Sequence, residues 1–131
     1  MCGILGGNSF NNIQEVKTGL ASLMHRGTDG NVIFHFKKNN FFLCHNRLSI
    51  QDLSESANQP LISEDEKFVL AFNGEMWKPF FKKYDKKLRK KYNFKTERSD
   101  SELLLYYLID NRDNILESMK NLEGMFCFAF Y

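Results

Sequence analysis

The chain has 131 residues, of which 43% are hydrophobic and thirteen are phenylalanine. This length and composition suit one folded domain with a real core and exclude a disordered polypeptide. The formal net charge is only +2, so overall charge does not favour nucleic acid or a membrane surface as a partner. Three cysteines without metal-like spacing, together with no signal or membrane-spanning pattern, predict a cytoplasmic protein without a disulfide framework or a zinc site.

The first third of the chain predicts a strand, a helix and a loop. Residues 2–7 form a short apolar strand that ends in glycine. Asn12, with Glu15 three residues later, is a capping box that starts a helix. Apolar residues then recur at helical spacing as far as Met24. Residues 25–30 hold two glycines and end this helix in a loop.

The middle of the chain predicts strands and one strongly basic segment. Strands over 31–36 and 41–45 flank a hairpin turn, and a further strand over 67–72 leads to Asn73-Gly74. Seven of the ten residues from Lys82 to Lys91 are basic. They either face an anionic partner or form the solvated side of a helix, and the second is the commoner case.

The last third predicts a buried helix and a closing strand. Ser99 opens a helix whose apolar residues, through Ile109, cover most of its circumference. A shorter helix around residues 115–119 precedes a strand over 125–131 that is apolar on both faces. This order predicts a layered α+β domain over residues 1–131. Because the chain ends on a strand of buried type, we expect a domain that is truncated at its carboxyl end.

Cys2 directly follows the initiator Met1, and removal of that methionine leaves a residue with both a thiol and a free α-amine. These groups ordinarily titrate at roughly 8.5 and 7.7–8.0, so the amine can act as a built-in base near neutral pH. A thiolate formed in this way attacks an amide carbonyl, and the protonated amine then gives its proton to the leaving ammonia. The alternative is a buried structural cysteine in an early strand.

Further motifs accompany Cys2 along nearly the whole chain. They are Met1-Cys2-Gly3-Ile4-Leu5-Gly6, His25-Arg26-Gly27-Thr28-Asp29-Gly30, His45-Asn46-Arg47-Leu48-Ser49-Ile50, Asn58-Gln59-Pro60, Asn73-Gly74-Glu75, Ser99-Asp100-Ser101-Glu102 and Leu122-Glu123-Gly124-Met125-Phe126. The order and spacing of these motifs resemble those of the class II glutamine amidotransferases, whose nucleophile is the N-terminal residue. The resemblance is closest to the glutaminase domain of asparagine synthetases.

The resemblance implies a catalytic role for three residues. Cys2 would be the nucleophile, while Asn73 through its side-chain amide and Gly74 through its backbone N–H would form the oxyanion hole. From the residues alone, Asn73-Gly74 is equally a strong hairpin-turn signal, and Cys2 a small buried side chain.

The resemblance also implies a substrate-binding set. Arg47 would pair with the α-carboxylate of glutamine, a task suited to a planar fork of donors. Glu75 and Asp100 would receive its α-ammonium, and Ile50 would contact the substrate. Taken singly, Arg47 could be a surface arginine, and Asp100 could serve the dipole of its helix. Glu102 is expected to be structural.

The resemblance further implies a four-layer αββα sandwich of the N-terminal-nucleophile hydrolase type and glutamine as the substrate. Family members continue into a synthetase domain in cis, which uses ATP and magnesium, so we expect no cofactor and no metal in this domain. A homodimer is left open, and no nucleic acid or membrane partner is expected. The final acceptor of the ammonia also stays open between aspartate, a sugar and another carboxylate.

Two positions depart from the family pattern. Thr28 stands where proline is usual, and Trp77-Lys78 replaces the usual Tyr-Asn after Asn73-Gly74-Glu75. These departures and the basic segment keep a second hypothesis open, a non-catalytic domain that binds glutamine or docks a partner. An N-terminal-nucleophile amidase for another amide is a third. Cys44 and Cys127 are expected to be buried hydrophobic residues, and His35 and His45 to occupy core or edge positions.

Overall fold

The computed structural model describes all residues, 1–131, and contains two three-stranded antiparallel sheets. The first has the order β1-β3-β2, with β1 Gly3–Gly7, β2 Gly30–Phe36 and β3 Phe41–Arg47. The second has the order β4-β5-β6, with β4 Leu61–Ile62, β5 Val69–Met76 and β6 Gly124–Phe130. The helices are α1 Ile13–Ser22, α2 Lys78–Lys91, α3 Asp100–Asp110 and α4 Ile115–Met119. The predicted mixed α+β architecture is confirmed.

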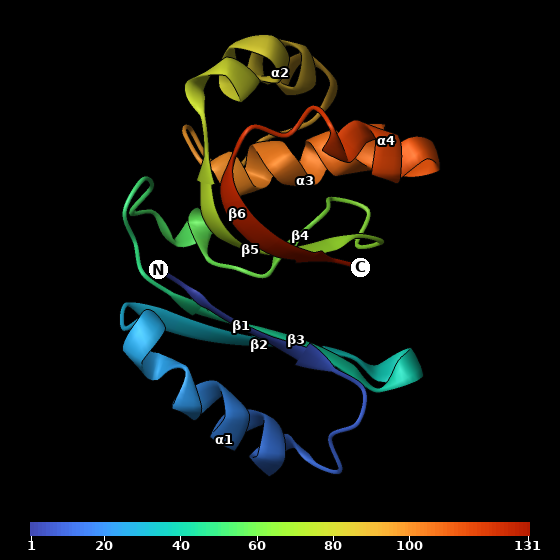
Figure 1. Cartoon of the computed structure of the whole chain (residues 1–131). Coiled ribbons are helices and arrows are strands. Elements are labelled where there is room, and N and C mark those ends of the chain that lie inside the picture. Colours follow the sequence, from blue (N-terminus) through green and yellow to red (C-terminus); the bar gives the residue numbers. More distant parts are fainter.

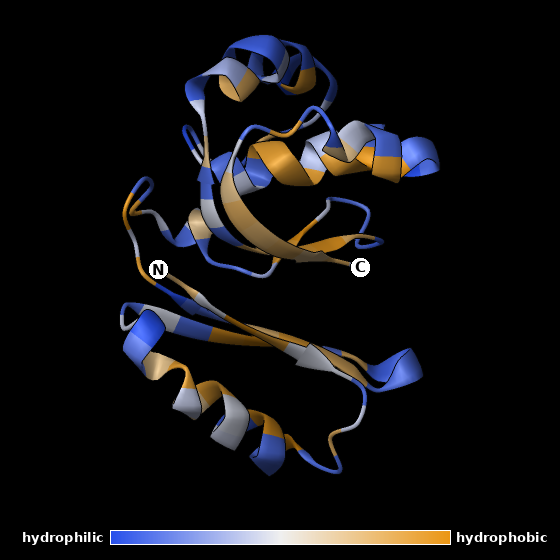
Figure 2. Ribbon diagram, viewed as in Figure 1, coloured by the Kyte–Doolittle hydropathy of each residue, from blue (hydrophilic) through white to orange (hydrophobic).

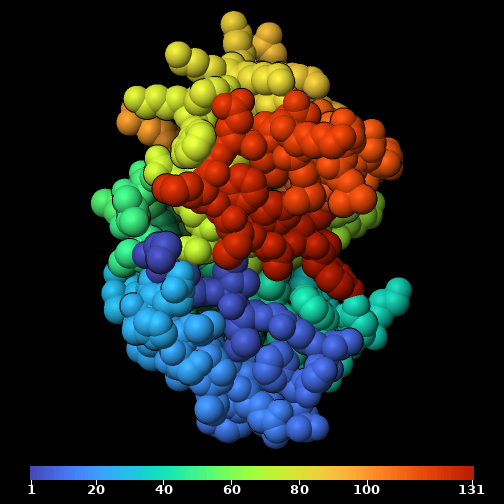
Figure 3. Space-filling view, viewed as in Figure 1, coloured from blue at the N-terminus to red at the C-terminus, as the bar shows by residue number.

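The two sheets lie face to face, with α1 on the outer side of the first and α3 on the outer side of the second (Figure 1). Helix α2 packs beside α3, at the end of the molecule furthest from α1 (Figure 1). In the space-filling view the blue amino-terminal residues meet the red carboxy-terminal ones between the two halves (Figure 3). The first residues of the chain therefore lie against strands from its second half.

Strand alternation explains why both faces of β3 are buried. Phe42 and Cys44 pack against Val16 and Leu20 of α1, whereas Leu43 points the other way and packs with Val69 of β5. Successive side chains of a strand point to opposite faces, so one apolar strand serves two layers. The hydropathy colouring shows this as orange along the strands between the layers (Figure 2).

Helix α3 is the most deeply buried element, because every residue from Asp100 to Ile109 is buried. The N-cap Ser99 accepts a hydrogen bond from Glu102 N through its side chain, at 3.4 Å. The predicted capping box is only half formed, since the Glu102 carboxylate does not return to Ser99. It accepts the backbone N–H groups of Lys95 and Thr96, both at 2.8 Å.

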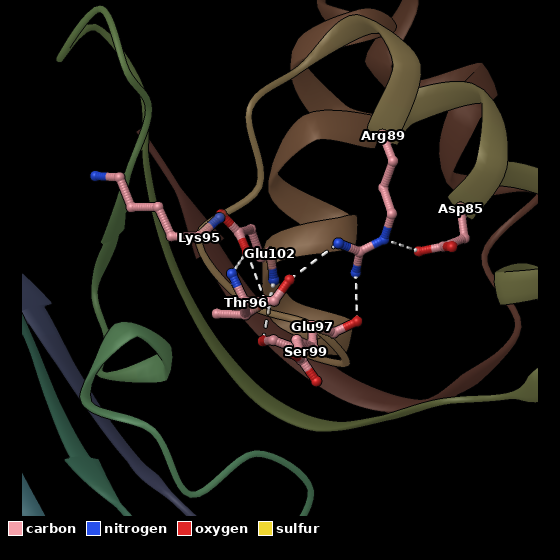
Figure 4. Close-up of polar contacts among 7 residues, drawn as sticks. All are labelled: Asp85, Arg89, Lys95, Thr96, Glu97, Ser99 and Glu102. Atoms are coloured by element: carbon pink, nitrogen blue, oxygen red, sulfur yellow. Dashed lines mark hydrogen bonds and ion pairs between the residues drawn. The ribbon is translucent and has the colours of Figure 1, made fainter.

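The segment before α3 is held from two sides (Figure 4). Arg89 of α2 is bonded to Asp85 and donates to the backbone oxygens of Thr96 and Glu97, at 2.9 and 2.7 Å. The Glu102 carboxylate binds the same segment from the α3 side. This double attachment fixes the amino end of α3, where Asp100 is placed.

The structure corrects two sequence expectations about strands. Strand β5 continues through Asn73-Gly74, where Gly74 pairs with Phe126 of β6, so the hairpin-turn alternative is wrong. Cys44 is fully buried, as expected, but Cys127 is exposed. The reason is that β6 pairs with β5 alone and is the edge strand of its sheet.

Helix α1 also differs from its expected extent. The helical spacing predicted a helix through Met24, but α1 ends at Ser22 and Met24 lies in an exposed 3₁₀ turn. The predicted turn between β2 and β3 is confirmed, and Asn40 there adopts the left-handed conformation with a φ of 49°. Left-handed backbone is tolerated well by asparagine, which explains this choice of residue.

Candidate active site

Cys2 lies directly before β1, half-buried between the two sheets. The backbone N–H of Leu48 donates to its sulfur at 3.4 Å, and its own backbone nitrogen donates to Asn73 Oδ1 at 2.8 Å. Nε of Arg26 donates to the Cys2 carbonyl oxygen at 3.0 Å. The Cys2 sulfur also lies 3.8 Å from the Leu48 carbonyl oxygen, and the two backbone contacts fix the position of the residue.

Asn73 and Gly74 reach this position from the middle of β5. The Asn73 side chain bonds to Cys2 through Oδ1, while its Nδ2 lies 3.8 Å from the sulfur of Cys127. Gly74 has a φ of 146°, and a β-carbon there would lie 2.6 Å from Cα of Phe126 and would overlap the Met125 carbonyl oxygen. Only glycine fits this backbone position, and the close pairing of β5 with β6 is the reason.

Arg47, the last residue of β3, is 8% exposed, and its guanidinium contacts only neutral oxygens. Nη1 donates to the backbone oxygen of Ser54 at 2.9 Å and to Oδ1 of Asn58 at 2.8 Å, and Nη2 donates to the backbone oxygen of Asp52. No carboxylate forms an ion pair with it. A buried cation without an ion-pair partner is costly, so this site is suited to an anionic ligand, although the charge of Arg47 also acts on the Asp29 and Asp52 carboxyls.

Glu75 and Asp100 are two acidic residues that line the same cavity as Arg47. Asp100 is 7% exposed, and the backbone N–H of Met76 donates to its Oδ2 at 3.2 Å. Burial raises the pKa of the Asp100 carboxyl, and the neighbouring Glu75 charge raises it further, against the effect of backbone N–H donors. Glu75 is exposed. A cation bound between these two carboxylates would relieve their repulsion.

A single cavity of about 340 Å³ is lined by every residue for which a functional role was expected. These residues are Cys2, Arg47, Ile50, Asn73, Gly74, Glu75 and Asp100. Ile50 is 73% exposed and therefore lies at the rim. Met1 also lines the cavity. The fold thus places one thiol, one guanidinium and three carboxylates, those of Asp52, Glu75 and Asp100, around a space that suits a small amino acid.

The structure also assigns supporting positions that sequence reasoning had left without a role. Within the Asn58-Gln59-Pro60 motif, Asn58 binds Arg47 and the Oε1 of Gln59 accepts the backbone N–H of Phe72 at 2.6 Å. The Asp29 carboxylate accepts the N–H of Ser49 at 2.7 Å, and this donor lowers the pKa of that carboxyl. Asn58, Gln59 and Asp29 all belong to the motifs found in the sequence, so membership of a motif was the signal that could have identified them.

Other positions lie outside the cavity lining. Trp77 and Lys78, which depart from the family pattern, do not line the cavity. His25 is exposed, with its Nδ1 3.1 Å from the Ser22 carbonyl oxygen. His45 occupies the expected core position, and its Nε2 lies 3.1 Å from the Phe72 carbonyl oxygen, which links β3 to β5.

Two further findings bear on the classes of partner. No helix is long and apolar enough to cross a bilayer. No group of three or more histidine, cysteine, aspartate or glutamate side chains is arranged to hold a metal ion.

The family model described as "Glutamine amidotransferase domain" matches residues 1–131, the whole chain. The chain belongs to this family. The resemblance drawn from the motifs is therefore confirmed, and the amidotransferase domain can be compared with individual relatives.

One relative is the "Probable asparagine synthetase [glutamine-hydrolyzing]" of Schizosaccharomyces pombe, 40% identical over 83% of this chain and 18% of the relative. A protein of the same name from Dictyostelium discoideum is 35% identical over all of this chain and 23% of the relative. "Amidase chry2" of Gibberella zeae is 29% identical over 98% of this chain and 18% of the relative. The amidotransferase domain thus spans about a fifth of the length of these relatives, and it is homologous to the glutamine-hydrolysing region of the synthetases.

Proposed function

We propose that this domain hydrolyses glutamine to glutamate and ammonia, with Cys2 as the nucleophile after removal of Met1. The observation that carries the proposal is the charge arrangement of the cavity. Arg47 is a nearly buried cation with only neutral acceptors, and Glu75 and Asp100 lie in the same lining. Free glutamine carries one α-carboxylate and one α-ammonium, so it satisfies both charges at once.

In the proposed first step, the free amine of Cys2 takes the thiol proton and the thiolate attacks the side-chain amide carbon of glutamine. The Leu48 N–H, 3.4 Å from the sulfur, stabilises the thiolate. The new carbon–sulfur bond places negative charge on the amide oxygen. Asn73 Nδ2 and the Gly74 N–H are the donors that would stabilise this oxyanion, and loss of such a donor costs roughly 3–4 kcal/mol.

Collapse of the tetrahedral intermediate breaks the carbon–nitrogen bond. The leaving nitrogen takes the proton held by the Cys2 amine and departs as ammonia, and a thioester remains on the sulfur. Water then adds to the thioester, with the amine again accepting a proton. Breakage of the carbon–sulfur bond releases glutamate and restores the thiol. The 2.8 Å contact from the Cys2 backbone N–H to Asn73 Oδ1 supports the proposal, because it holds in the site the nitrogen that becomes the free amine once Met1 is removed.

We further propose that residues 1–131 are one incomplete glutaminase domain with the four-layer αββα sandwich of the N-terminal-nucleophile hydrolases. Two stacked sheets between α1 and α3 support that assignment (Figure 1). In the longer protein a synthetase domain in cis would consume the ammonia, in a cytoplasm that keeps the thiol reduced. ATP and magnesium are proposed to bind only that synthetase domain. No step here runs through those groups.

The test is glutamate release by chain whose Met1 is shown by mass spectrometry to be absent. We expect turnover and a covalent adduct at Cys2 with an electrophilic glutamine analogue. Cys2→Ala abolishes both, whereas Cys127→Ala, which removes the other accessible thiol, retains both. If processed chain binds glutamine in calorimetry but yields neither glutamate nor adduct, the second hypothesis of a binding module replaces the proposal.

The acceptor of the ammonia has two candidates. The synthetase names of most relatives favour aspartate. The name of another relative, "Amidase chry2", does not specify aspartate, and the alternative is a sugar or another carboxylate as acceptor. Amide formation by the full-length protein with aspartate, compared with other carboxylic acids in the presence of ATP, separates these candidates.

A further inference from the structure

Helix α2 concentrates positive charge in a way that the rest of the molecule does not. Its fourteen residues include eight basic side chains and one acid, a formal charge of +7. The whole chain carries only +2, so the remaining residues together are acidic by five charges. Figure 2 shows the helix as mostly hydrophilic, at the end of the molecule furthest from α1. None of its residues lines the cavity of the proposed active site.

Half of these cations serve the fold. Lys87 and Lys91 pair with Asp110 at the end of α3. Arg89 binds Asp85 and the segment before α3 (Figure 4). The Nζ of Lys83 lies 5.1 Å from the centre of the Tyr84 ring. Internal contacts therefore explain these residues without an external partner.

The other four cations have no such contacts. Lys78, Lys82, Lys86 and Lys90, which we call the lysine stripe, are exposed and form no hydrogen bond or ion pair. They follow one another at intervals of four residues. At about 100° per residue they fall in an arc of about 120°, centred opposite the buried side of the helix, which holds Phe80 and Leu88. The stripe thus points to solvent along the whole helix.

Helix stability does not account for the stripe. Like charges at i and i+4 repel one another, and the stripe contains three such pairs in sequence. Lys78 stands at the amino end, where the helix dipole disfavours a cation, and the first turn has no acid to offset it. A ligand with several negative charges would relieve this repulsion.

We propose that the lysine stripe is a docking surface for an acidic segment of a partner protein. The stripe steps about 6 Å per lysine along a helix of about 21 Å, which matches carboxylates spaced every fourth residue on a partner helix. Lysine presents a point charge that suits single carboxylates, and the one arginine of α2 is turned inward.

Two other classes of anionic partner fit less well. A nucleic acid strand that extends beyond the footprint of α2 meets a surface that is acidic on balance. Insertion into a membrane needs several apolar side chains, but Phe80 and Leu88 are buried and the only exposed large apolar residue is Trp77, at the amino-terminal cap of α2. A short acidic protein segment matches both the size and the isolation of the charge.

The experiment measures binding of a fluorescent peptide with glutamate at every fourth position, by anisotropy, to the full chain. The test variant changes Lys78, Lys82, Lys86 and Lys90 to glutamine. The matched control changes four exposed lysines elsewhere to glutamine, and these are Lys17, Lys37, Lys38 and Lys120. A double variant, Lys82→Gln with Lys86→Gln, serves if the quadruple variant has a lower unfolding temperature than the control.

We expect binding that is sensitive to salt, because salt screens exposed charges. Each exposed ion pair is individually weak, but loss of four together should weaken binding about tenfold or more in the test variant and little in the control. Lys82→Glu with Lys86→Glu, which lowers the charge of α2 from +7 to +3, should weaken binding of the glutamate peptide more than Lys82→Gln with Lys86→Gln does. The proposal is overturned if the peptide does not bind, or if its binding weakens equally in both variants. It is also overturned if a single-stranded oligonucleotide or an anionic vesicle binds more tightly than the peptide in a way that depends on the stripe. Glutamine turnover is not part of the readout, so this result is independent of the proposed hydrolysis.

Discussion

The backbone nitrogen of Cys2 donates a hydrogen bond to Oδ1 of Asn73 at 2.8 Å, across 71 residues of sequence. This contact joins the beginning of the chain to the middle of β5. It therefore couples the proposed nucleophile to the proposed oxyanion donor in one rigid unit. The packing of the two sheets makes the contact, since β1 belongs to one sheet and β5 to the other.

Replacement of Asn73 should slow turnover more than it weakens binding. In Asn73→Ala we expect kcat to fall by roughly 10²–10³, because a preorganised donor to the oxyanion is lost, while KM for glutamine changes little. Steady-state kinetics on chain without Met1 checks this. A rise in KM with kcat unchanged would assign Asn73 to ground-state binding instead. Asn31→Ala, an exposed asparagine of β2, is the control.

Replacement of Arg47 should act on binding. In Arg47→Lys the ammonium cannot contact three oxygens and still present a fork to a carboxylate. A hydrogen bond to a charged group contributes roughly 1.5–3 kcal/mol, so we expect KM to rise about 10- to 100-fold with a smaller change in kcat. Calorimetry with glutamine measures the same loss directly. Unchanged affinity would refute the assignment of Arg47 to the α-carboxylate.

Asp100 should make glutamine affinity dependent on pH. Its pKa is raised, chiefly by burial, so the carboxyl takes up a proton at a higher pH than an exposed aspartate does. Affinity should therefore fall as pH decreases through this raised pKa, since the neutral acid no longer pairs with the α-ammonium. In Asp100→Asn we expect weak affinity that lacks this pH dependence, measured by calorimetry from neutral to mildly acidic pH.

The same substitution should not destabilise the fold. Because the pKa of Asp100 is higher in the folded state, folding favours the protonated form, and the ionised form costs stability above the folded pKa. Asparagine retains an oxygen for the N–H of Met76. We expect the unfolding temperature of Asp100→Asn at neutral pH to equal or exceed that of the unmodified chain. A marked decrease would show a structural role.

Gly74→Ala should strongly destabilise the domain. The φ of 146° and the overlap with the backbone of β6 leave no room for a β-carbon. We expect a loss of at least about 3 kcal/mol in the free energy of unfolding, measured with denaturant. Gly30→Ala is the matched control, since its nearest contact would be Asn58 Oδ1 at 3.9 Å, and it should stay within about 1 kcal/mol.

His45 should make the fold sensitive to acid. Burial lowers its pKa to about 4 from an ordinary value of 6.5. The unfolded chain therefore binds a proton at a higher pH than the folded chain, so stability falls as pH decreases from about 6.5 to about 4. The full effect is roughly 3 kcal/mol. In His45→Gln this part of the pH dependence of the unfolding free energy should vanish, while exposed His25→Gln should leave it unchanged.

The sequence alone determined a large part of this description. Helical spacing and capping residues predicted α1 and α3, and alternation or apolar runs predicted most strands, because these patterns depend on neighbours within a few residues. The ordered motifs predicted the family, and the seven residues to which they assign roles all lie in the lining of one cavity. These predictions needed no knowledge of how the two sheets pack.

Only the tertiary structure decided how those residues act together. It placed Asn73 against Cys2, left Arg47 buried without a counter-ion, and put Gly74 inside a strand where local sequence favoured a turn. It also exposed Cys127 on the edge strand β6, although the surrounding sequence is apolar. Such properties arise from strand pairing and sheet packing between distant segments, and the free energy of those long-range contacts overrides the local preference.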